Sequence, residues 1–272
     1  MSTKSLTEQD SNYDDLERMS ISEILHSIND EDKEIPFAIE NSLVQIETLI
    51  EKVVSVLEGD GRLFYIGAGT SGRLGVLDAS ECVTTFGIAP GVIIGLIAGG
   101  DSALRTAVEG AEDDTTQGMK DLEAYGISPK DFVLGIAASG RTPYVAHALK
   151  DCRERNISTG CIVCSPNSLV RCFADYPIEV FVGPEFVTGS TRMKAGTAQK
   201  LVLNMISTAS MIKLGRVEGN KMTHMFLSNS KLIDRGIRIV MEKTGLGYDE
   251  SAALLKSCNY RIQPALEKFR GH

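Results

Sequence analysis

Five short apolar runs alternate with helical stretches through the middle of the chain. They contain almost no polar residue and span residues 63–66, 92–98, 132–137, 160–164 and 178–182. Strands that are apolar throughout are typical of parallel sheets, because helices cover both faces of such a sheet. The pattern therefore predicts an α/β fold with a doubly wound, five-stranded parallel sheet of flavodoxin-like order. In such folds the ligand lies at the carboxyl ends of the strands, near the switch point of the topology.

A glycine-rich turn follows the first apolar run and leads into a helix. It reads GAGTSG from Gly67 to Gly72, and apolar residues then resume at helical spacing. Free backbone N–H groups and the helix dipole meet at such a helix N-terminus and favour an anion. The hydroxyls of Thr70 and Ser71 add neutral donors. We therefore expect Gly69, Thr70, Ser71 and Gly72 to bind a phosphate group.

The same glycines also fit the dinucleotide fingerprint GxGxxG. A dinucleotide site needs an acidic residue about 20 residues further on, at the end of the second strand. Here the second strand leads through two glycines to Asp101, which comes late and has the position of a helix cap. Phosphate binding is therefore favoured over a dinucleotide cofactor. A turn that needs glycine for steric reasons alone stays open as an alternative.

A second hydroxyl-rich turn follows the third apolar run. It contains Ser139, Gly140, Arg141 and Thr142, and Pro143 then takes the first position of a helix. Two such turns after neighbouring parallel strands can hold one phosphate group from two sides. We therefore include these four residues in the expected phosphate site. The alternative is a capped helix start without a ligand, with Arg141 as a solvated side chain.

The composition excludes several classes of protein. The net charge of −8 argues against nucleic-acid binding, which needs a basic face. No apolar run approaches the length of about 18 residues of a membrane span, and the polar N-terminus has no signal-peptide core. Six cysteines are scattered rather than arranged as a disulfide framework, and no pattern of metal ligands occurs. We expect a cytoplasmic protein without a metal.

Helical segments precede and follow the predicted sheet domain. A capping box at Ser20 predicts a short helix, an acidic loop follows at residues 29–34, and Pro36 begins a long helix that ends at Gly59. The apolar stripe of that helix, which begins at Ile39, can pack on a sheet or on another subunit. We divide the chain into an N-terminal helical segment at 1–58, a sheet domain at 59–220 and a C-terminal helical region at 221–272.

Further helices are expected between and after the strands, at residues 102–111, 116–125, 144–155, 194–214 and 221–243, the last with a break near 228–230. Ser190 or Thr191 is the expected cap of the helix that begins near Lys194. The Lys194 side chain is available to neutralise an anion, although helix capping alone is an equal alternative. A glycine joint at Gly245 and Gly247 then leads to two small helices.

Several longer motifs occur together in this chain. They are GAGTSGRLGVLDASEC, GLIAGG, AVEGAEDD, GIAASGRTPYV and TGSTRMKAGTAQKLVLNMIST. Their combination closely resembles the bacterial N-acetylmuramic acid 6-phosphate etherase family of the sugar-isomerase (SIS) domain superfamily, from about residue 29 to 265. The resemblance implies a SIS domain at residues 59–220, a homodimer and no cofactor. It also implies cleavage of a lactyl ether, which yields N-acetylglucosamine 6-phosphate and D-lactate.

The resemblance also implies roles for single residues. The two catalytic glutamates of the family fall on Glu81, in DASEC, and on Glu112, in EGAED. The hydroxyls that hold the sugar phosphate fall on Ser71, Ser139 and Thr142. The chemistry needs one base, to remove the acidified proton on carbon 2, and one acid, to protonate the departing lactate. We expect Glu81 to be the acid and Glu112 to be the base, and the reverse assignment stays open as the alternative.

Two departures from the family and two rival functions remain. Val83 and Thr84 follow DASEC where relatives have prolines, and the chain ends soon after Ala265, which predicts a reduced C-terminal region. The rival functions are a SIS-type sugar-phosphate isomerase and a non-catalytic sugar-phosphate-sensing regulatory protein. An isomerase needs no acid for a leaving group, and a sensor does not need both glutamates. The presence of Glu81 and Glu112 within their full motifs favours the etherase.

Overall fold

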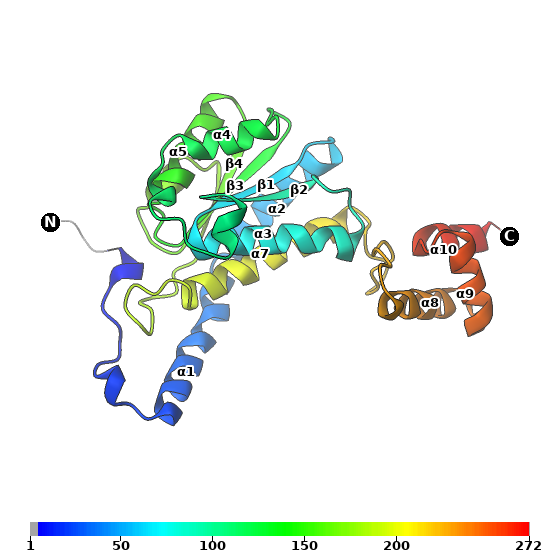
Figure 1. Cartoon of the computed structure of the whole chain (residues 1–272), viewed down its shortest axis with the longest axis horizontal. Helices are drawn as coiled ribbons and strands as arrows, with labels where there is room; N and C mark the ends of the chain where they lie inside the picture. The colour runs from blue at the N-terminus through cyan, green and yellow to red at the C-terminus, as the bar shows by residue number, and fades with distance from the viewer. Residues whose placement is uncertain (1–4, 272) are drawn as a thin grey trace.

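A five-stranded parallel sheet is the centre of the molecule (Figure 1). The computed structural model describes residues 5–271, and its strands are β1 Leu63–Gly67, β2 Ile93–Ile97, β3 Phe132–Ala137, β4 Ser158–Val163 and β5 Tyr176–Glu179. The strand order is β2-β1-β3-β4-β5, and each neighbouring pair is parallel. The predicted doubly wound α/β fold with flavodoxin-like order is therefore confirmed.

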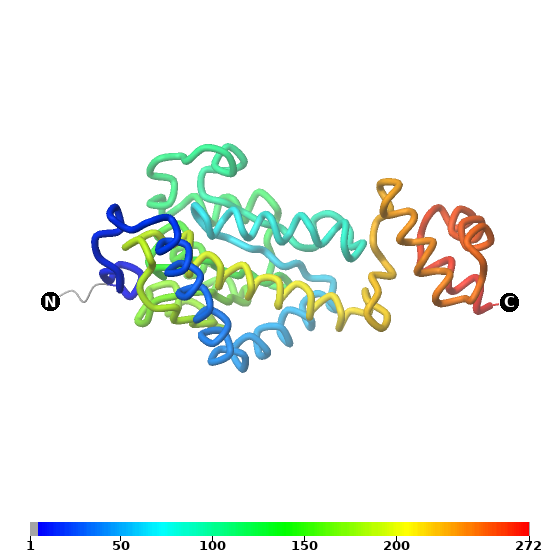
Figure 2. The backbone as a smooth tube through the Cα atoms, turned by 90° about the horizontal axis from the view of Figure 1, so that it is seen from below, coloured from blue at the N-terminus to red at the C-terminus, as the bar shows by residue number. Residues whose placement is uncertain are grey.

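Helices cover both faces of the sheet. One face carries α2 Leu43–Glu58, α3 Gly69–Phe86 and α7 Lys194–Lys213, and the other carries α4 Gln117–Ala124, α5 Pro143–Glu154 and α6 Leu169–Cys172. In Figure 2, which is seen from below, α7 runs beside α3 along the same face of the sheet. Tyr65 points into the first core and Phe64 into the second, and both are fully buried. This burial on two sides explains why the strands are apolar throughout.

The winding of the chain reverses between β1 and β3. Gly67 at the end of β1 is in register with Ile97 of β2 and with Ile136 of β3. The turns that follow these three strands therefore lie side by side at the carboxyl ends of the strands. In open α/β sheets this is where ligands bind.

The first long helix is continuous, and the predicted acidic loop at residues 29–34 is wrong. Helix α1 spans Ile21–Glu40 and extends away from the sheet domain (Figure 1). The predicted capping box at its start is confirmed, because Ser20 and Glu23 bond each other's backbone N–H groups. Pro36 lies inside the helix rather than at its beginning. The helix ends at Glu40 instead, and α2 begins at Leu43. Between the two helices, the Ser42 hydroxyl donates a hydrogen bond to the carbonyl of Glu179.

Tertiary contacts explain why α1 continues through its acidic stretch. Ile35 and Ile39 are buried against the sheet domain, at 1% and 2% exposure. Glu31 forms an ion pair with Lys194 of α7. A proline inside a helix costs about 3 kcal/mol, and these anchors on both sides of Pro36 offset that cost.

Two other predictions about helices are corrected. Residues 102–111 form no helix and contain only the end of a short 3₁₀ turn, Asp101–Leu104, and the start of another, Ala111–Asp113. The predicted caps Ser190 and Thr191 do not cap α7. The buried Glu185 carboxylate accepts from the N–H groups of Lys194 and Ala195 instead, at 2.7 and 3.0 Å. The predicted helices at 116–125, 144–155 and 194–214 are confirmed as α4, α5 and α7.

The C-terminal helices pack around a core of their own. Helices α8 Ser230–Thr244, α9 Tyr248–Ser257 and α10 Ile262–Arg270 lie apart from the sheet domain, beyond the irregular residues 214–229 (Figure 1). The helix expected from residue 221 thus begins only at Ser230, after the expected break. The division at residue 220 stays a prediction. Within residues 5–271, none of the helices combines the length and apolarity that crossing a bilayer requires.

A buried carboxylate joins the beginnings of β1 and β3. Asp131 accepts from the Arg62 backbone N–H, Nε and Nη2 at 2.9 to 3.0 Å, and from the Ser128 N–H at 2.8 Å. Burial by itself raises the pKa of Asp131. The donors from Arg62 and Ser128 outweigh burial and hold this pKa below its usual value.

We expect Asp131→Asn to lower the free energy of unfolding by about 2–4 kcal/mol at pH 7, because the donors lose their charged partner. The folded-state pKa is depressed, so this stability is present above the unfolded pKa of about 3.9 and is lost as pH falls through the folded value. Urea unfolding should show a smaller gap between wild type and variant at pH 3 than at pH 7. An equal gap at both pH values would contradict the expectation.

Candidate functional site

Helix α3 begins inside the glycine-rich turn, directly after β1. Its N-cap is Ala68, which has no side chain to cap the helix, and its first turn contains no acidic residue. The first intrahelical backbone bond runs from the N–H of Gly72 to the carbonyl of Ala68. The N–H groups of Gly69, Thr70 and Ser71 therefore have no partner within the helix. This N-terminus leaves the positive end of the dipole free for an anion.

The glycines of this turn serve different purposes. A Cβ at Gly72 would lie 2.6 Å from the Ile97 side chain and 2.7 Å from the carbonyl oxygen of Gly67. Gly72 is thus needed for close packing of α3 against the sheet. At this position the steric explanation of the glycine, given above as an alternative, applies. Gly69 has a φ of +53°, and nothing lies within 4 Å of the place of its missing side chain. Gly69 is exposed and leaves the backbone open to a ligand.

The second turn lies beside the first, at the end of the neighbouring strand β3. Gly140 has a φ of +67°, and a Cβ there would lie 2.0 Å from the Cβ of Ser168. The Ser139 hydroxyl accepts from the Arg141 N–H at 3.3 Å, and Arg141 is exposed. Thr142 is the N-cap of α5, but its hydroxyl makes no capping bond. The Thr142 hydroxyl therefore remains available at a second helix N-terminus.

Two residues near the turns have partners that the sequence does not reveal. The Ser71 hydroxyl is buried and donates to Oε1 of Gln199 on α7 at 2.8 Å. Lys194 is 3% exposed, and its ammonium group pairs with Glu31 of α1. The N-terminus of α7 is already neutralised by Glu185, whose pKa is raised by burial. Lys194 thus has a carboxylate partner within the chain rather than the anion considered from the sequence.

Glu112 lies close to the first turn of α3. It is exposed on the 3₁₀ turn Ala111–Asp113, and it lines a cavity of about 190 Å³ together with Gly69 and Arg73. Arg73 fixes the loop before this turn, because its guanidinium donates to the carbonyls of Ala103 and Leu104 at 2.7 and 3.1 Å. This role of Arg73 is not among the predictions from the sequence. Its only signal is an arginine directly after the glycine turn.

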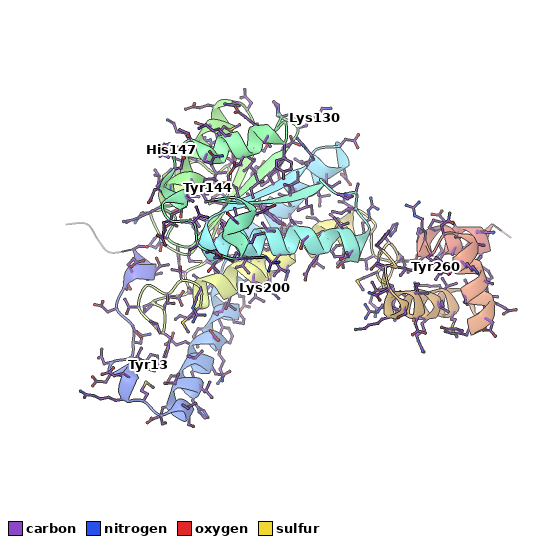
Figure 3. The ribbon with its side chains drawn as sticks, in the orientation of Figure 1. Tyr13, Lys130, Tyr144, His147, Lys200 and Tyr260 are labelled. Carbon is purple, nitrogen blue, oxygen red and sulfur yellow. The ribbon has the colours of Figure 1, made fainter. Side chains whose placement is uncertain are left out.

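Glu81 lies elsewhere on α3. Its ten-residue separation from Ser71 corresponds to about 15 Å along the helix axis. Glu81 is exposed and lines a separate crevice of about 30 Å³ between α3 and α7, together with Asp78 and Lys200. Figure 3 labels Lys200 on α7. The structure therefore does not bring Glu81 and Glu112 into one cavity of the same chain.

A buried carboxylate one helical turn before Glu81 holds α3 in place. Asp78 accepts from the Tyr65 hydroxyl at 3.1 Å, from Asn204 Nδ2 at 2.9 Å and from the Ser207 hydroxyl at 3.0 Å. Burial raises the pKa of Asp78, and the charge of Glu81 adds to the increase. The donors come from β1 and α7, so the network determines how α3 presents Glu81. Sequence reasoning missed this residue, although it stands inside the motif LDASEC.

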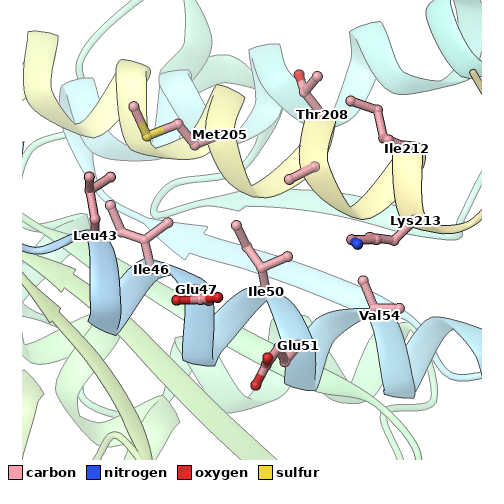
Figure 4. A pocket seen from close by; sticks show the side chains of 11 residues that line it. Leu43, Ile46, Glu47, Ile50, Glu51, Val54, Met205, Thr208, Ile212 and Lys213 are labelled. Carbon is pink, nitrogen blue, oxygen red and sulfur yellow. The ribbon is translucent and has the colours of Figure 1, made fainter. Parts of the chain in front are cut away.

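A wider groove lies away from these residues, between α2 and α7. It has a volume of about 810 Å³, and side chains of both helices line it (Figure 4). Leu43, Ile50, Met205 and Ile212 make its lining largely apolar. Among residues 5–271, no three His, Cys, Asp or Glu side chains come together as a group that could hold a metal ion.

The fold has relatives among solved sugar-phosphate isomerases. A phosphoheptose isomerase from Francisella tularensis superposes with a TM-score of 0.57 at 17% identity, covering 71% of this chain and 100% of that one. The phosphoheptose isomerase of Neisseria gonorrhoeae gives 0.54 at 18% identity, with coverage of 70% and 98%. At such identities the likeness shows the fold alone.

Sequence comparison is more specific. The family model of the SIS domain matches residues 106–209, and that of the glucokinase regulatory protein N-terminal SIS domain matches residues 45–153. The N-acetylmuramic acid 6-phosphate etherase of Bacteroides thetaiotaomicron is 55% identical over 98% of this chain and 96% of its own length. The etherase of Christiangramia forsetii is 61% identical over 92% of this chain and 91% of its own length. The chain therefore belongs to the N-acetylmuramic acid 6-phosphate etherase family.

Proposed function

We propose that this chain is a carbon–oxygen lyase that cleaves the D-lactyl ether of N-acetylmuramic acid 6-phosphate. Its products are N-acetylglucosamine 6-phosphate and D-lactate. The observation that carries the proposal is the 48–61% identity to relatives named for this activity, over 92–98% of the chain. The open N-terminus of α3 beside Glu112 supports it, because a phosphorylated sugar needs an anion site next to a carboxylate.

The reaction proceeds by elimination and then by addition of water. With the sugar ring open, the aldehyde acidifies the proton on carbon 2, and a carboxylate removes it. The electron pair forms a double bond between carbons 2 and 3, while the bond from carbon 3 to the lactyl oxygen breaks. A carboxylic acid protonates that oxygen, and D-lactate leaves. Water then adds its hydroxyl to carbon 3 and a proton to carbon 2.

The position of Glu112 suits the base of this reaction. Six bonds separate the phosphorus from carbon 2, and at about 1.5 Å each they span at most about 9 Å. Glu112 shares a cavity with Gly69 of the phosphate site. Glu81 is about 15 Å along α3 from Ser71, by the rise of the helix. The lactyl oxygen is also six bonds from the phosphorus, so this limit favours Glu112 over Glu81 of the same chain at both reacting positions. We keep the assignment expected from the sequence, with Glu112 as the base at carbon 2 and Glu81 as the acid that protonates lactate and later activates water.

The distance of Glu81 leads to a proposal about assembly. We infer a homodimer in which Glu81 of one protomer completes the site that contains Glu112 of its partner. Two surfaces support an interface between copies. Helix α1 extends from the domain with Ile21 and Leu25 exposed, and the groove between α2 and α7 exposes Met205 and Ile212. A two-fold axis would place the same pair of surfaces on both protomers.

D-lactate release tests the function. The purified chain should convert N-acetylmuramic acid 6-phosphate to D-lactate and N-acetylglucosamine 6-phosphate in equal amounts. In ¹⁸O-labelled water the label should enter the sugar at carbon 3 and stay out of the lactate, because the bond at carbon 3 is the one that breaks. Isomerisation without lactate release would favour the rival isomerase. Binding without any turnover would favour the regulatory protein. As part of this proposal, we also infer from the sequence that the protein is cytoplasmic.

Ser139→Ala tests the phosphate site. We expect the variant to raise KM about 10- to 100-fold with little change in kcat, because a lost hydrogen bond to a charged group costs about 1.5–3 kcal/mol. Unphosphorylated N-acetylmuramic acid should be a very poor substrate of the wild type. Steady-state kinetics with both sugars provide the measurement. Comparable turnover of the two sugars would exclude this role for the turn.

A further inference from the structure

Gln199 lies behind the first turn of α3 and is completely buried, at 0% exposure. Its Oε1 accepts the hydroxyl proton of Ser71 at 2.8 Å. Its Nε2 is buried as well and has no hydrogen-bond partner among the residues that the structure describes. Buried donors without a partner are rare in native proteins, so this one needs an explanation.

The surroundings hold Gln199 in place without satisfying its amide nitrogen. The Thr70 side chain approaches α7 so closely that a Cβ at Gly196 would lie 3.3 Å from it. The start of α7 is fixed by Glu185. The terminal torsion of a glutamine is broad and roughly two-fold, so the amide can still turn end over end. Its oxygen and nitrogen have nearly the same size, and such a turn leaves the packing unchanged.

The observed hydrogen bond conflicts with the expected task of Ser71. Phosphate oxygens accept hydrogen bonds, so a hydroxyl that holds a phosphate must donate to it. Ser71 has one hydroxyl proton, which it donates to Gln199. If the amide turns by half a revolution, Nε2 donates to the Ser71 oxygen instead. That turn gives Nε2 a partner and frees the proton of Ser71 for the phosphate. It leaves Oε1 as the buried atom without a partner, and a buried carbonyl oxygen tolerates this better than a buried N–H does.

We propose that Gln199 is a positioning residue of the phosphate site. Its amide reverses when a phosphorylated sugar binds, and Ser71 then donates to the phosphate rather than to Gln199. An anion that only accepts hydrogen bonds is required for this reversal, because the freed proton of Ser71 must find an acceptor. Gln199 thereby favours phosphorylated over unphosphorylated ligands. The proposal rests on the proposed function in one respect, namely that Ser71 contacts the phosphate.

A double-mutant cycle tests this coupling. Binding of N-acetylglucosamine 6-phosphate is measured by calorimetry for the wild type, Gln199→Met, Ser71→Ala and the double variant. We expect Gln199→Met to weaken binding about 10-fold and Ser71→Ala about 10- to 100-fold, from the cost of one hydrogen bond to a charged group. The double variant should bind no more weakly than Ser71→Ala, because Gln199 acts through Ser71. Ser210→Ala is the matched control, since the Ser210 hydroxyl is buried on the same helix without a partner.

Two results would overturn the proposal. One is wild-type affinity in Gln199→Met, and the other is a double variant whose loss equals the product of the single losses. Kinetics give a second criterion, because a positioning role on the phosphate raises KM and leaves kcat nearly unchanged. A purely structural role would instead lower the melting temperature without this selective effect on phosphorylated ligands. Affinity for inorganic phosphate should follow the same order among the variants.

The wild-type protein provides a measurement that does not depend on folding of Gln199→Met. With glutamine-selective ¹⁵N labelling, the side-chain amide of Gln199 is identified as the one that Ser71→Ala shifts. Added N-acetylglucosamine 6-phosphate should slow hydrogen exchange of this amide, because Nε2 gains a partner. Unchanged exchange in the complex would overturn the reversal. The etherase proposal is tested separately. It fails if the wild type binds the sugar phosphate but releases no D-lactate.

Discussion

Glu81→Gln and Glu112→Gln should each lower D-lactate release about 10²- to 10⁴-fold, the usual range for loss of a general acid or base. The two variants should differ in a second reaction. With N-acetylglucosamine 6-phosphate in heavy water, Glu81→Gln should still exchange the carbon-2 proton, because Glu112 remains as the base. Glu112→Gln should lose this exchange together with lactate release. Proton NMR of the sugar follows the exchange, and an enzymatic assay follows D-lactate.

Asp113→Asn is the matched control for this comparison. Asp113 is exposed on the same 3₁₀ turn as Glu112 but does not line the cavity beside α3. The control should retain both reactions, which separates loss of the Glu112 carboxylate from loss of acidic charge on the turn. If Glu81→Gln cannot exchange the proton and Glu112→Gln can, the two roles are reversed. Full lactate release by either variant would remove that glutamate from the mechanism.

A heterodimer of the same two variants should recover activity that each variant lacks alone. In a shared site, the Glu81→Gln protomer supplies Glu112 and the Glu112→Gln protomer supplies Glu81. One of the two sites of the heterodimer then carries both wild-type glutamates, so about half of the wild-type activity per dimer is expected. Co-expression with two affinity tags isolates the heterodimer, and D-lactate release is measured. Sites contained within one chain would leave the heterodimer inactive.

The control pairs two defects from the same half of the site. Glu112→Gln and Ser139→Ala both belong to the edge of the sheet where the turns after β1, β2 and β3 lie side by side. Their heterodimer should show no recovery at substrate concentrations below the raised KM, because neither site regains both residues. Sedimentation of the wild type at micromolar concentration should show a dimer. An active monomer would contradict the shared site.

The errors in predicting helices have one physical origin. The stretch around residues 29–34 is polar and is followed by Pro36, so its local preferences favour a loop. The helix continues because Ile35 and Ile39 are buried and Glu31 meets Lys194. At residues 102–111 the error is the opposite, because a helix is predicted and none forms. Their periodicity favours a helix, but Arg73 binds the carbonyls of Ala103 and Leu104, and the chain follows that anchor.

The residue pattern is sufficient to predict the five strands, their parallel arrangement and the two turns at the carboxyl ends of β1 and β3. These features depend on interactions that are close in the chain or on burial of both sheet faces, and either leaves a pattern in the residue types. The expected position of the anion site also follows from local order, because a strand that leads through glycines into a helix leaves backbone N–H groups free.

Which side chains meet around that site depends on contacts between segments that are far apart in the chain. Ser71 and Gln199 are 128 residues apart, and Asp78 and Asn204 are 126 residues apart. No periodicity links residues at such separations, since their contact arises from packing α7 against α3 beneath the sheet. The same packing separates Glu81 from Glu112, although the sequence motifs suggest a single pair. The position of Glu81 along α3 is the structural ground for the proposed shared site, in addition to the homodimer that the family resemblance implies.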